Sequence, residues 1–464
     1  MTTEQLIRGR RIGIVGMARS GMAAAYLAVS QGGKPFVSDS ARSELLREAG
    51  DRLKRDAIPF ETDGHTERLL QSDYLVVSPG VPPHLDILEE ARRRGIPVFS
   101  ELEFASWVNR GRIVAVTGSN GKTTTTTLIG EIFAAAGYEV FVCGNIGRPF
   151  CEVAHQVTPQ GIAVVEVSTF QLEAIADFQP QVALILNLTA DHLDRHGTFE
   201  KYKALKYRIA ANQGTEDFLI VNRDDHHLAH DTITTSARKL FFTAGDSADA
   251  VAFVDDGGYL CGRSGSEVSR IVKYNDILIP GPHNLQNAAA AVATATLFDI
   301  EATAISKTLR SFPGVEHRLE NAGRVAGVSF VNDSKATNID SVCWALRSID
   351  TPIHLIAGGR DKGNDYQPLA EHGAGRIKSL VAIGEARHKI SNELGRSFPV
   401  QLADSLSDAV RVSFEMAHPG ETVLLSPGCA SFDMFDNYEH RGRVFKTAVA
   451  SLKNGAQKNE TFAN

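Results

Sequence analysis

Short apolar runs recur along this chain and alternate with segments of helical periodicity. Each run is closed by glycine or by polar residues, and the runs between residues 140 and 187 are near-continuous in apolar residues. Such runs are typical of parallel strands covered by helices on both faces. They lie at Arg11–Gly16, Pro35–Asp39, Asp73–Gly80, Val140–Cys143, Ile162–Glu166, Val182–Asn187, Val328–Asn332, Ile353–Gly358, Leu380–Gly384 and Val423–Pro427. The alternation predicts an α/β fold with mostly parallel sheets.

The length of 464 residues suits about three domains. A short helical stretch at 104–111 and the segment after Phe312 are the expected boundaries. We therefore expect a Rossmann-like domain at 1–108, a central P-loop-type domain at 109–313 and a second Rossmann-like domain at 314–464. The central domain should include a strand-rich elaboration at about 225–280, where the sequence has turn residues and few candidate functional side chains.

The stretch Ile113–Thr124 is the most informative in the chain. An apolar strand leads into a loop with Gly118 and Gly121, and Lys122 and Thr123 then open an apolar-periodic helix. Glycines let backbone N–H groups approach an anion, the lysine reaches β- and γ-phosphates, and the threonine hydroxyl can hold Mg²⁺. The stretch predicts a nucleoside triphosphate site, although the first glycine of a regular Walker A loop is absent. A tight strand-to-helix turn with an exposed lysine is the alternative.

Polar groups also follow the neighbouring strands of the central domain. Asn145, Glu166 and the pair Asp191-His192 come at or after strand ends. Because carboxyl ends of parallel strands meet at one edge of a sheet, these groups should converge near Lys122. A carboxylate and a neutral imidazole are suitable Mg²⁺ ligands beside nucleotide phosphates. Taken singly, Glu166 or His192 would more often be a structural residue.

Weaker signals come from elsewhere in the chain. The first strand ends in an imperfect dinucleotide fingerprint, with Ala18 at the middle glycine position. It favours a nucleotide-like ligand other than NAD. Asn284 and Asn287 lie three residues apart at a helix start, and they suit either an adenine edge or helix capping alone. The last third carries a cationic and hydroxyl-bearing rim that suits a small dicarboxylate, or else forms a solvated loop face: Asp333, Lys335, Thr337, Lys362 and Ser431.

Composition limits the partners. Hydrophobic residues make up 43% of the chain, which is ordinary for a globular protein. The net charge is −7 and no basic stripe is present, so nucleic acid is not an expected partner. Five scattered cysteines without a CxxC pair suit a reducing compartment. Without a signal-peptide pattern or a bilayer-length apolar run, we expect a cytoplasmic protein with no membrane insertion.

Together these motifs resemble a known family. Thr117-Gly-Ser-Asn-Gly-Lys-Thr123, Glu166-Val-Ser168, Asp191-His192, His283-Asn-x-x-Asn287 and His317-Arg318 resemble, in this order, the Mur ligases, ATP-dependent amide-forming enzymes of peptidoglycan synthesis. The strings Asn332–Asn338 and Leu425–Asp433 resemble those of the members that add D-glutamate. The resemblance covers essentially the whole chain. It implies the small-molecule substrates UDP-N-acetylmuramoyl-L-alanine and D-glutamate, ATP, two Mg²⁺ ions (with Mn²⁺ as a substitute) and a monomer.

The resemblance also implies roles for individual residues. The catalytic set would be Lys122, Glu166, His192 and Lys206, and the metal ligands would be Thr123, Glu166, His192 and Lys206 as a carbamate. ATP would meet Gly118, Asn120, Gly121, Lys122, Thr123, Thr124, Asn284, Asn287, Arg318 and Asp333. The uridine substrate would meet Arg19, Ser20, Asp39, Ser40, Gly80, Asn145 and His192. D-Glutamate would meet Lys335, Thr337, Lys362, Ser431, Phe432 and Tyr438.

Several alternatives stay open from the sequence. Ala41 stands where a uracil-facing arginine is expected, with Arg42 adjacent, and Tyr438 stands where phenylalanine is frequent. Lys203 lies three residues from Lys206 and competes with it for the carbamate role, and either could be a surface lysine. Folylpolyglutamate synthase and a non-catalytic module that senses nucleotide are the alternative functions. The intact Asn332–Asn338 string argues against the first, and the retained Lys122 argues against the second.

Overall fold

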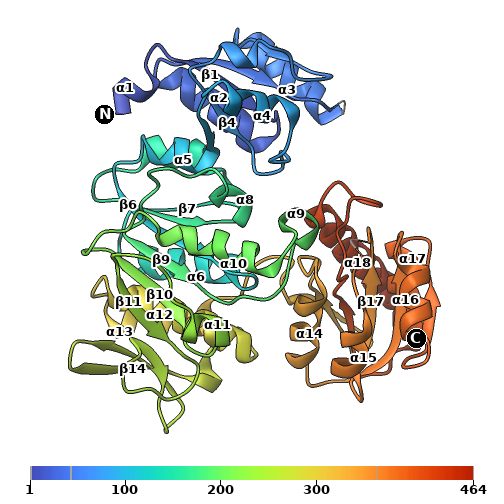
Figure 1. Cartoon of the computed structure of the whole chain (residues 1–464). Helices are drawn as coiled ribbons and strands as arrows, with labels where there is room; N and C mark the ends of the chain where they lie inside the picture. Colours follow the sequence, from blue (N-terminus) through green and yellow to red (C-terminus); the bar gives the residue numbers. More distant parts are fainter. Residues whose placement is uncertain (1–2, 42–43, 362, 463–464) are drawn as a thin grey trace. The chain divides into compact units, whose positions relative to one another are not determined.

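The structure is a computed structural model, and it describes residues 3–41, 44–361 and 363–462. Arg42 and Lys362, both named above, lie outside the described residues. By their contacts the residues form two compact units. The first runs to residue 277 and includes residues 286–311, and the second comprises residues 278–285 and those from 312 onward. Three mainly parallel sheets, each with its helices, confirm the predicted α/β class (Figure 1).

The first sheet is wholly parallel, with strand order β3-β2-β1-β4-β5. Its order reverses at β1, so the turns after β1 and β4 flank the switch point at which α/β sheets bind ligands. The strands are β1 (Arg11–Val15), β2 (Lys34–Ser38), β3 (Phe60–Glu61), β4 (Tyr74–Val77) and β5 (Val98–Ser100), and the helices are α1 (Thr3–Ile7), α2 (Arg19–Ser30), α3 (Glu44–Arg55), α4 (Asp86–Arg93) and α5 (Glu101–Ser106).

The second sheet has the order β14-β13-β12-β11-β10-β9-β6-β8-β7, and its pairs are parallel except for β12–β13 and β13–β14, which are antiparallel. β11 to β14 all lie in the stretch at about 225–280 where a strand-rich elaboration was expected. The strands are β6 (Arg112–Thr117), β7 (Val140–Gly144), β8 (Ile162–Glu166), β9 (Val182–Ile185), β10 (Phe218–Asn222), β11 (Arg238–Phe242), β12 (Ala252–Val254), β13 (Tyr259–Ser264) and β14 (Glu267–Lys273). The helices are α6 (Lys122–Ala135), α7 (Phe150–Val153), α8 (Thr169–Leu172), α9 (Leu193–His196), α10 (Phe199–Tyr207), α11 (His226–His230), α12 (Pro282–Thr296) and α13 (Ala302–Ser311).

The third sheet has the order β15-β16-β20-β17-β18-β19, and only the edge strand β15 is antiparallel. Alternate residues of its central strands enter two separate cores: Leu355 packs with α14, α15 and α16, whereas Ile356 packs with α17 and α18. The elements are β15 (Glu320–Val325), β16 (Val328–Asn332), β17 (Ile353–Gly358), β18 (Ile377–Ile383), β19 (Val400–Leu402), β20 (Thr422–Leu425), α14 (Ile339–Arg347), α15 (Gln367–Gly373), α16 (Arg387–Leu394), α17 (Leu406–Met416) and α18 (Tyr438–Phe462).

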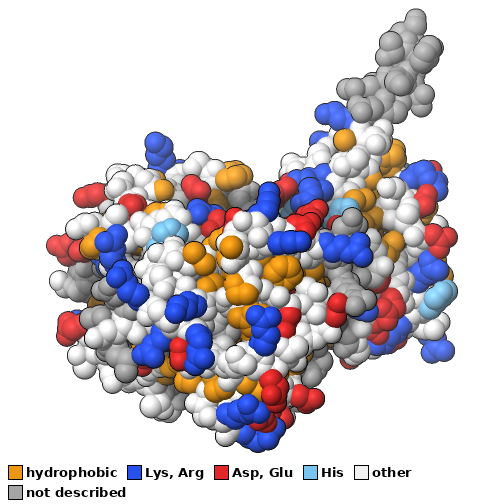
Figure 2. Space-filling view, turned by 90° about the horizontal axis from the view of Figure 1, so that it is seen from above, with side chains coloured by type: hydrophobic (Ala, Val, Ile, Leu, Met, Phe, Trp, Pro, Cys, Tyr) orange, Lys and Arg blue, Asp and Glu red, His pale blue; other side chains and the backbone are white. Residues whose placement is uncertain are grey.

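The surface agrees with the modest net charge. Basic and acidic side chains of the described residues are interspersed on the face in Figure 2, with apolar side chains between them. Among the described helices, none combines the length and the apolar character needed to cross a bilayer. The five cysteines are all buried thiols without a disulfide partner.

Candidate active site

The loop between β6 and α6 has the geometry of an anion cradle. Gly118 and Gly121 have φ angles of +155° and +81°, which L side chains rarely adopt. Gly121 precedes the 14-residue helix α6 and, as a glycine, places no side-chain cap on its start, which is the arrangement in which a helix N-terminus receives an anion. The loop is fixed from β9, because the Asn120 backbone N–H donates to Asn187 Oδ1 at 2.8 Å and the Ser119 N–H donates to the Asn187 carbonyl oxygen at 3.0 Å.

Two lysines meet at this loop. Lys122 Nζ and Lys206 Nζ both donate to the Gly118 carbonyl oxygen, at 2.8 and 2.7 Å, so the two nitrogens lie at most 5.5 Å apart. Lys206 comes from α10 and is only 2% exposed. Burial holds the pKa of Lys206 well below its usual range, and the neighbouring Lys122 lowers it further. Two ammonium groups on one oxygen would repel each other, so the arrangement favours a neutral Lys206 amine.

Lys203, on the same helix, differs from Lys206 in its hydrogen-bond partners and in the direction in which its pKa is shifted. Its ammonium donates to Asp231 at 2.8 Å and to Glu200 at 3.0 Å. The hydrogen bonds to Asp231 and Glu200 raise its pKa above the usual value. Lys203 is therefore a protonated partner of two carboxylates, whereas Lys206 faces the phosphate loop.

The carboxylate of Glu166, at the end of β8, bridges two neighbouring strand ends. Its Oε2 accepts from the Thr123 hydroxyl at 2.7 Å, and its Oε1 accepts from Asn145 Nδ2 at 2.9 Å. Of the strand-end groups predicted to converge near Lys122, Asn145 and Glu166 are therefore in contact with each other, and Glu166 reaches Thr123, the residue after Lys122. His192 lies half-buried with a left-handed φ of +52°, and its ring packs edge-on against Phe170 at a centroid distance of 5.0 Å.

The residues expected to meet a uridine nucleotide lie at the carboxyl ends of β1, β2 and β4. Asp39 Oδ2 accepts from the Met17 backbone N–H at 2.7 Å, and Oδ1 accepts from the Ala41 N–H at 2.9 Å, so this carboxylate orders both turns. Ser40 and Gly80 are exposed. Arg19 Nη1 donates to the Gly147 carbonyl oxygen at 3.4 Å, on the loop that also carries Asn145.

The paired asparagines of α12 have different surroundings. Asn287 Oδ1 accepts from the Thr125 hydroxyl at 3.2 Å. A Cβ atom at Gly121 would lie 2.3 Å from the same oxygen, so Asn287 packs directly on the phosphate loop. Asn284 Nδ2 instead donates to the Pro280 carbonyl oxygen at 2.7 Å.

In the second unit, the polar loops after β16 and β20 meet. Asp333 is 1% exposed, its Oδ2 accepts from the Ser426 hydroxyl at 2.8 Å, and burial raises its pKa to about 6 against the opposing charge of Arg318. Lys335 Nζ donates to the Tyr438 hydroxyl at 3.1 Å and lies over the ring of the same residue. Ser431 is buried, whereas Phe432 is exposed.

Several contributors to these sites were absent from the sequence interpretation. Tyr202 lies beneath the phosphate loop, with its hydroxyl 2.9 Å from the Ser119 hydroxyl. Buried Arg441 donates to the Ser334 and Cys429 carbonyl oxygens. No local pattern in the sequence marks these residues, because their partners are distant in the chain.

Comparison with known proteins places the chain in a family. Residues 11–87 match the MurD N-terminal domain, residues 116–295 the Mur ligase middle domain, and residues 317–429 the Mur ligase glutamate ligase domain. Proteins called UDP-N-acetylmuramoylalanine--D-glutamate ligase from Chloroherpeton thalassium and Koribacter versatilis are 40% and 42% identical, and each alignment covers 97% of this chain and 100% of the relative.

Solved structures agree on the fold. UDP-N-acetylmuramate-alanine ligase MurC from Thermotoga maritima is 18% identical with a TM-score of 0.61, covering 95% of this chain and 99% of that one. MurF ligase from Thermotoga maritima, in complex with ADP, is 14% identical with a TM-score of 0.61, covering 97% of each chain. This chain therefore belongs to the Mur ligase family, alongside the relatives called UDP-N-acetylmuramoylalanine--D-glutamate ligase.

Proposed function

We propose that this chain is an ATP-dependent ligase that joins the amine of D-glutamate to the terminal carboxylate of UDP-N-acetylmuramoyl-L-alanine. The observation that carries the proposal is the phosphate loop, where Lys122 folds onto the Gly118 carbonyl oxygen and the next residue, Thr123, bonds Glu166, in a chain whose near-full-length relatives bear that name. The reaction belongs to peptidoglycan precursor synthesis.

The donor set fits a divalent cation with nucleotide phosphates. Thr123 and Glu166 would hold a first Mg²⁺, and His192 with a carbamylated Lys206 would hold a second. Hydroxyl, carboxylate and imidazole groups are ordinary Mg²⁺ partners when phosphates supply further oxygens. Bound Mg²⁺ would supply charge neutralisation for the crowded phosphate oxygens.

The carbamate at Lys206 is supported by the state of its amine. A neutral lysine amine adds to CO₂ through a new N–C bond and releases one proton, leaving an anionic carbamate. Burial and the nearby Lys122 keep the Lys206 pKa low, which favours the neutral, nucleophilic form. The ion-paired Lys203 lacks this property.

The chemistry would run in two steps. The alanine carboxylate oxygen attacks the γ-phosphorus of ATP, and the bond from that phosphorus to the β,γ-bridging oxygen breaks. ADP departs, and the substrate carries an acyl phosphate. Lys122 stabilises the charge that develops on the phosphate oxygens during this transfer. The amine of D-glutamate then attacks the acyl carbon, loses a proton and expels inorganic phosphate, and an amide remains.

The remaining binding roles are assigned residue by residue. Arg19, Ser20, Asp39, Ser40 and Gly80 would bind the uridine diphosphate part, with Asn145 near its phosphates. Asn284, Asn287, Arg318 and Asp333 would complete the ATP site. Lys335, Thr337, Ser431, Phe432 and Tyr438 would bind D-glutamate, and the Tyr438 hydroxyl would orient the Lys335 ammonium toward a carboxylate.

The test is a phosphate-release assay with ATP, Mg²⁺, UDP-N-acetylmuramoyl-L-alanine and an amino acid. We expect release to require the uridine precursor and D-glutamate together, since the amine must discharge the acyl phosphate. L-Glutamate, D-alanine and lysine serve as matched alternatives. Equal turnover with D-alanine or lysine would refute the assignment of D-glutamate to the Lys335 and Ser431 loops.

A further inference from the structure

Arg318 lies in a turn whose backbone is unusual for L residues. His317 and Leu319, which flank it, have φ angles of +65° and +45°. This left-handed region is sparsely populated by residues other than glycine, and such a conformation persists only where surrounding contacts impose it. The conformation of this turn fixes the direction in which Arg318 leaves the backbone.

Glu320, the first residue of β15, holds the turn from one side. Its Oε2 accepts from the His317 backbone N–H at 2.9 Å and from Asn332 Nδ2 at 2.9 Å. The same Asn332 amide lies 2.9 Å from His317 Nδ1. An amide NH₂ group can only donate, so Nδ1 is the acceptor in this contact, and burial lowers the pKa of His317, which favours the neutral ring that the contact requires.

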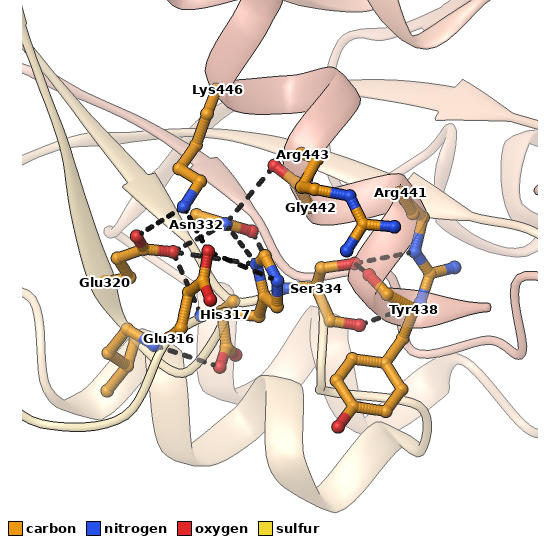
Figure 3. A network of polar contacts seen from close by, with 12 residues as sticks. Glu316, His317, Glu320, Asn332, Ser334, Tyr438, Arg441, Gly442, Arg443 and Lys446 are labelled. Atoms are coloured by element: carbon orange, nitrogen blue, oxygen red, sulfur yellow. Dashed lines mark hydrogen bonds and ion pairs between the residues drawn. The ribbon is translucent and has the colours of Figure 1, made fainter. Parts of the chain in front are cut away.

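Lys446 of α18 closes this network from the other side (Figure 3). Its ammonium donates to Glu320 Oε1 at 2.9 Å and to Glu316 Oε1 at 2.5 Å. Glu316, His317 and Glu320 are close enough together to suit a metal ion. The Lys446 ammonium already supplies the positive charge between the two carboxylates. We therefore assign Lys446, rather than a metal ion, as the cation of this cluster.

The turn is also tied to the polar loop after β16. The Leu319 N–H donates to Asp333 Oδ1 at 3.3 Å, and the Lys335 N–H donates to the His317 carbonyl oxygen at 3.1 Å. Helix α18 abuts the imidazole, since a Cβ atom at Gly442 would lie 2.2 Å from His317 Nδ1. The network therefore connects α18 and β15 with the segment that carries Arg318 and Asp333.

We propose that Glu320 and Lys446 are positioning residues for nucleotide binding: they hold the His317–Leu319 turn in its left-handed conformation and thereby direct Arg318 toward ATP. This inference rests on the proposed function, because it takes Arg318 as a nucleotide contact. Neither Glu320 nor Lys446 needs to touch the nucleotide for it to hold.

The experiment uses the full chain with Lys446→Met, Lys446→Arg and Glu320→Gln. The matched control is Lys453→Met, which removes an exposed lysine two turns further along α18. For each variant we measure KM for ATP, KM for the uridine precursor, kcat, the melting temperature, and the Kd of a non-hydrolysable ATP analogue with Mg²⁺. Lys446→Met is also combined with Arg318→Met.

We expect Lys446→Met and Glu320→Gln to raise both KM for ATP and Kd of the analogue by about 10-fold to 100-fold, the loss typical of a misdirected binding group. KM for the uridine precursor should stay within about 2-fold, Lys446→Arg should restore most of the affinity, and Lys453→Met should resemble the wild type. Lys446→Met should add little to Arg318→Met, because both act through one contact.

Other outcomes overturn the inference. Unchanged nucleotide affinity in Lys446→Met and Glu320→Gln, with only a lower melting temperature, would mean that the network is merely structural. Full additivity with Arg318→Met would mean that Lys446 does not act through Arg318. A wild-type chain that binds the analogue but releases no phosphate would refute the proposed function, whereas the Kd comparison would still decide this inference.

Discussion

Replacing Asp333 by asparagine should stabilise the second unit at neutral pH while impairing turnover. Burial raises the pKa of this carboxyl from 3.8 to about 6. A carboxyl with a raised folded-state pKa binds its proton more tightly in the folded chain. Its contribution to stability is therefore fully present below the unfolded pKa and is lost as the pH rises through about 6. At neutral pH the folded chain carries a charge that burial disfavours.

The magnitude follows from the size of the shift. About two pKa units at about 1.4 kcal/mol each give about 3 kcal/mol of destabilisation at pH about 8, and about 1 kcal/mol at pH about 4.5. The asparagine side-chain oxygen can still accept from the Leu319 N–H. Its NH₂ group, a donor, would face the Ser426 hydroxyl, which now donates to the carboxylate. The altered hydrogen bond costs about 1 kcal/mol, so the net gain should be about 2 kcal/mol at pH about 8 and near zero at pH about 4.5.

Urea unfolding at both pH values measures the difference in free energy of unfolding between Asp333→Asn and the wild type. Trp344 on α14 reports on the second unit, and a Trp107→Phe background in all chains removes the tryptophan of the first unit. Asp350→Asn, at an exposed carboxylate of the same unit, is the control and should leave the pH dependence unchanged. Phosphate release should fall with Asp333→Asn, because the anion is assigned to the nucleotide site.

Two results would refute this reasoning. Stabilisation of equal size at both pH values would mean that the charge of Asp333 is not its source. Destabilisation at pH about 8 would mean that the lost hydrogen bonds outweigh the relief of the buried charge.

Three further predictions concern the same chemistry. Lys122→Ala should lower kcat by several orders of magnitude and leave the melting temperature nearly unchanged, since one charge facing a developing phosphate charge contributes roughly 3 kcal/mol or more; a variant that fails to fold would contradict this. Lys206→Ala should be nearly inactive and partly rescued by acetate or formate, whereas Lys203→Ala should be mildly affected; near-normal turnover of Lys206→Ala without bicarbonate would exclude the carbamate. Tyr438→Phe should raise KM for D-glutamate by about 3-fold to 10-fold with KM for ATP unchanged, because Lys335 loses one hydrogen-bond partner; an unchanged KM for D-glutamate would show that the hydroxyl is not used.

Local patterns in the sequence were sufficient for the fold class and for the phosphate loop. Near-continuous apolar runs identify buried parallel strands because both faces of each strand need apolar cover. The loop was predictable because its requirements are local: Gly118 and Gly121 adopt left-handed φ angles, and α6 begins directly afterwards at Lys122. The meeting of Asn145 and Glu166 beside the phosphate loop followed from topology, since the carboxyl ends of parallel strands share one edge.

Tertiary structure decided what spacing could not. Lys203 and Lys206 are three residues apart on one helix, and both could have faced either way by periodicity. Packing buries Lys206 against the phosphate loop, whereas Lys203 meets Asp231 and Glu200.

The network around Arg318 could not be predicted from the sequence either, because Glu320 and Lys446 are separated by 126 residues. The raised pKa of Asp333 likewise arises from burial in the folded chain. A sequence specifies which groups are available. The folded chain decides which of them lose water and meet a partner, because that depends on contacts between residues far apart in the sequence.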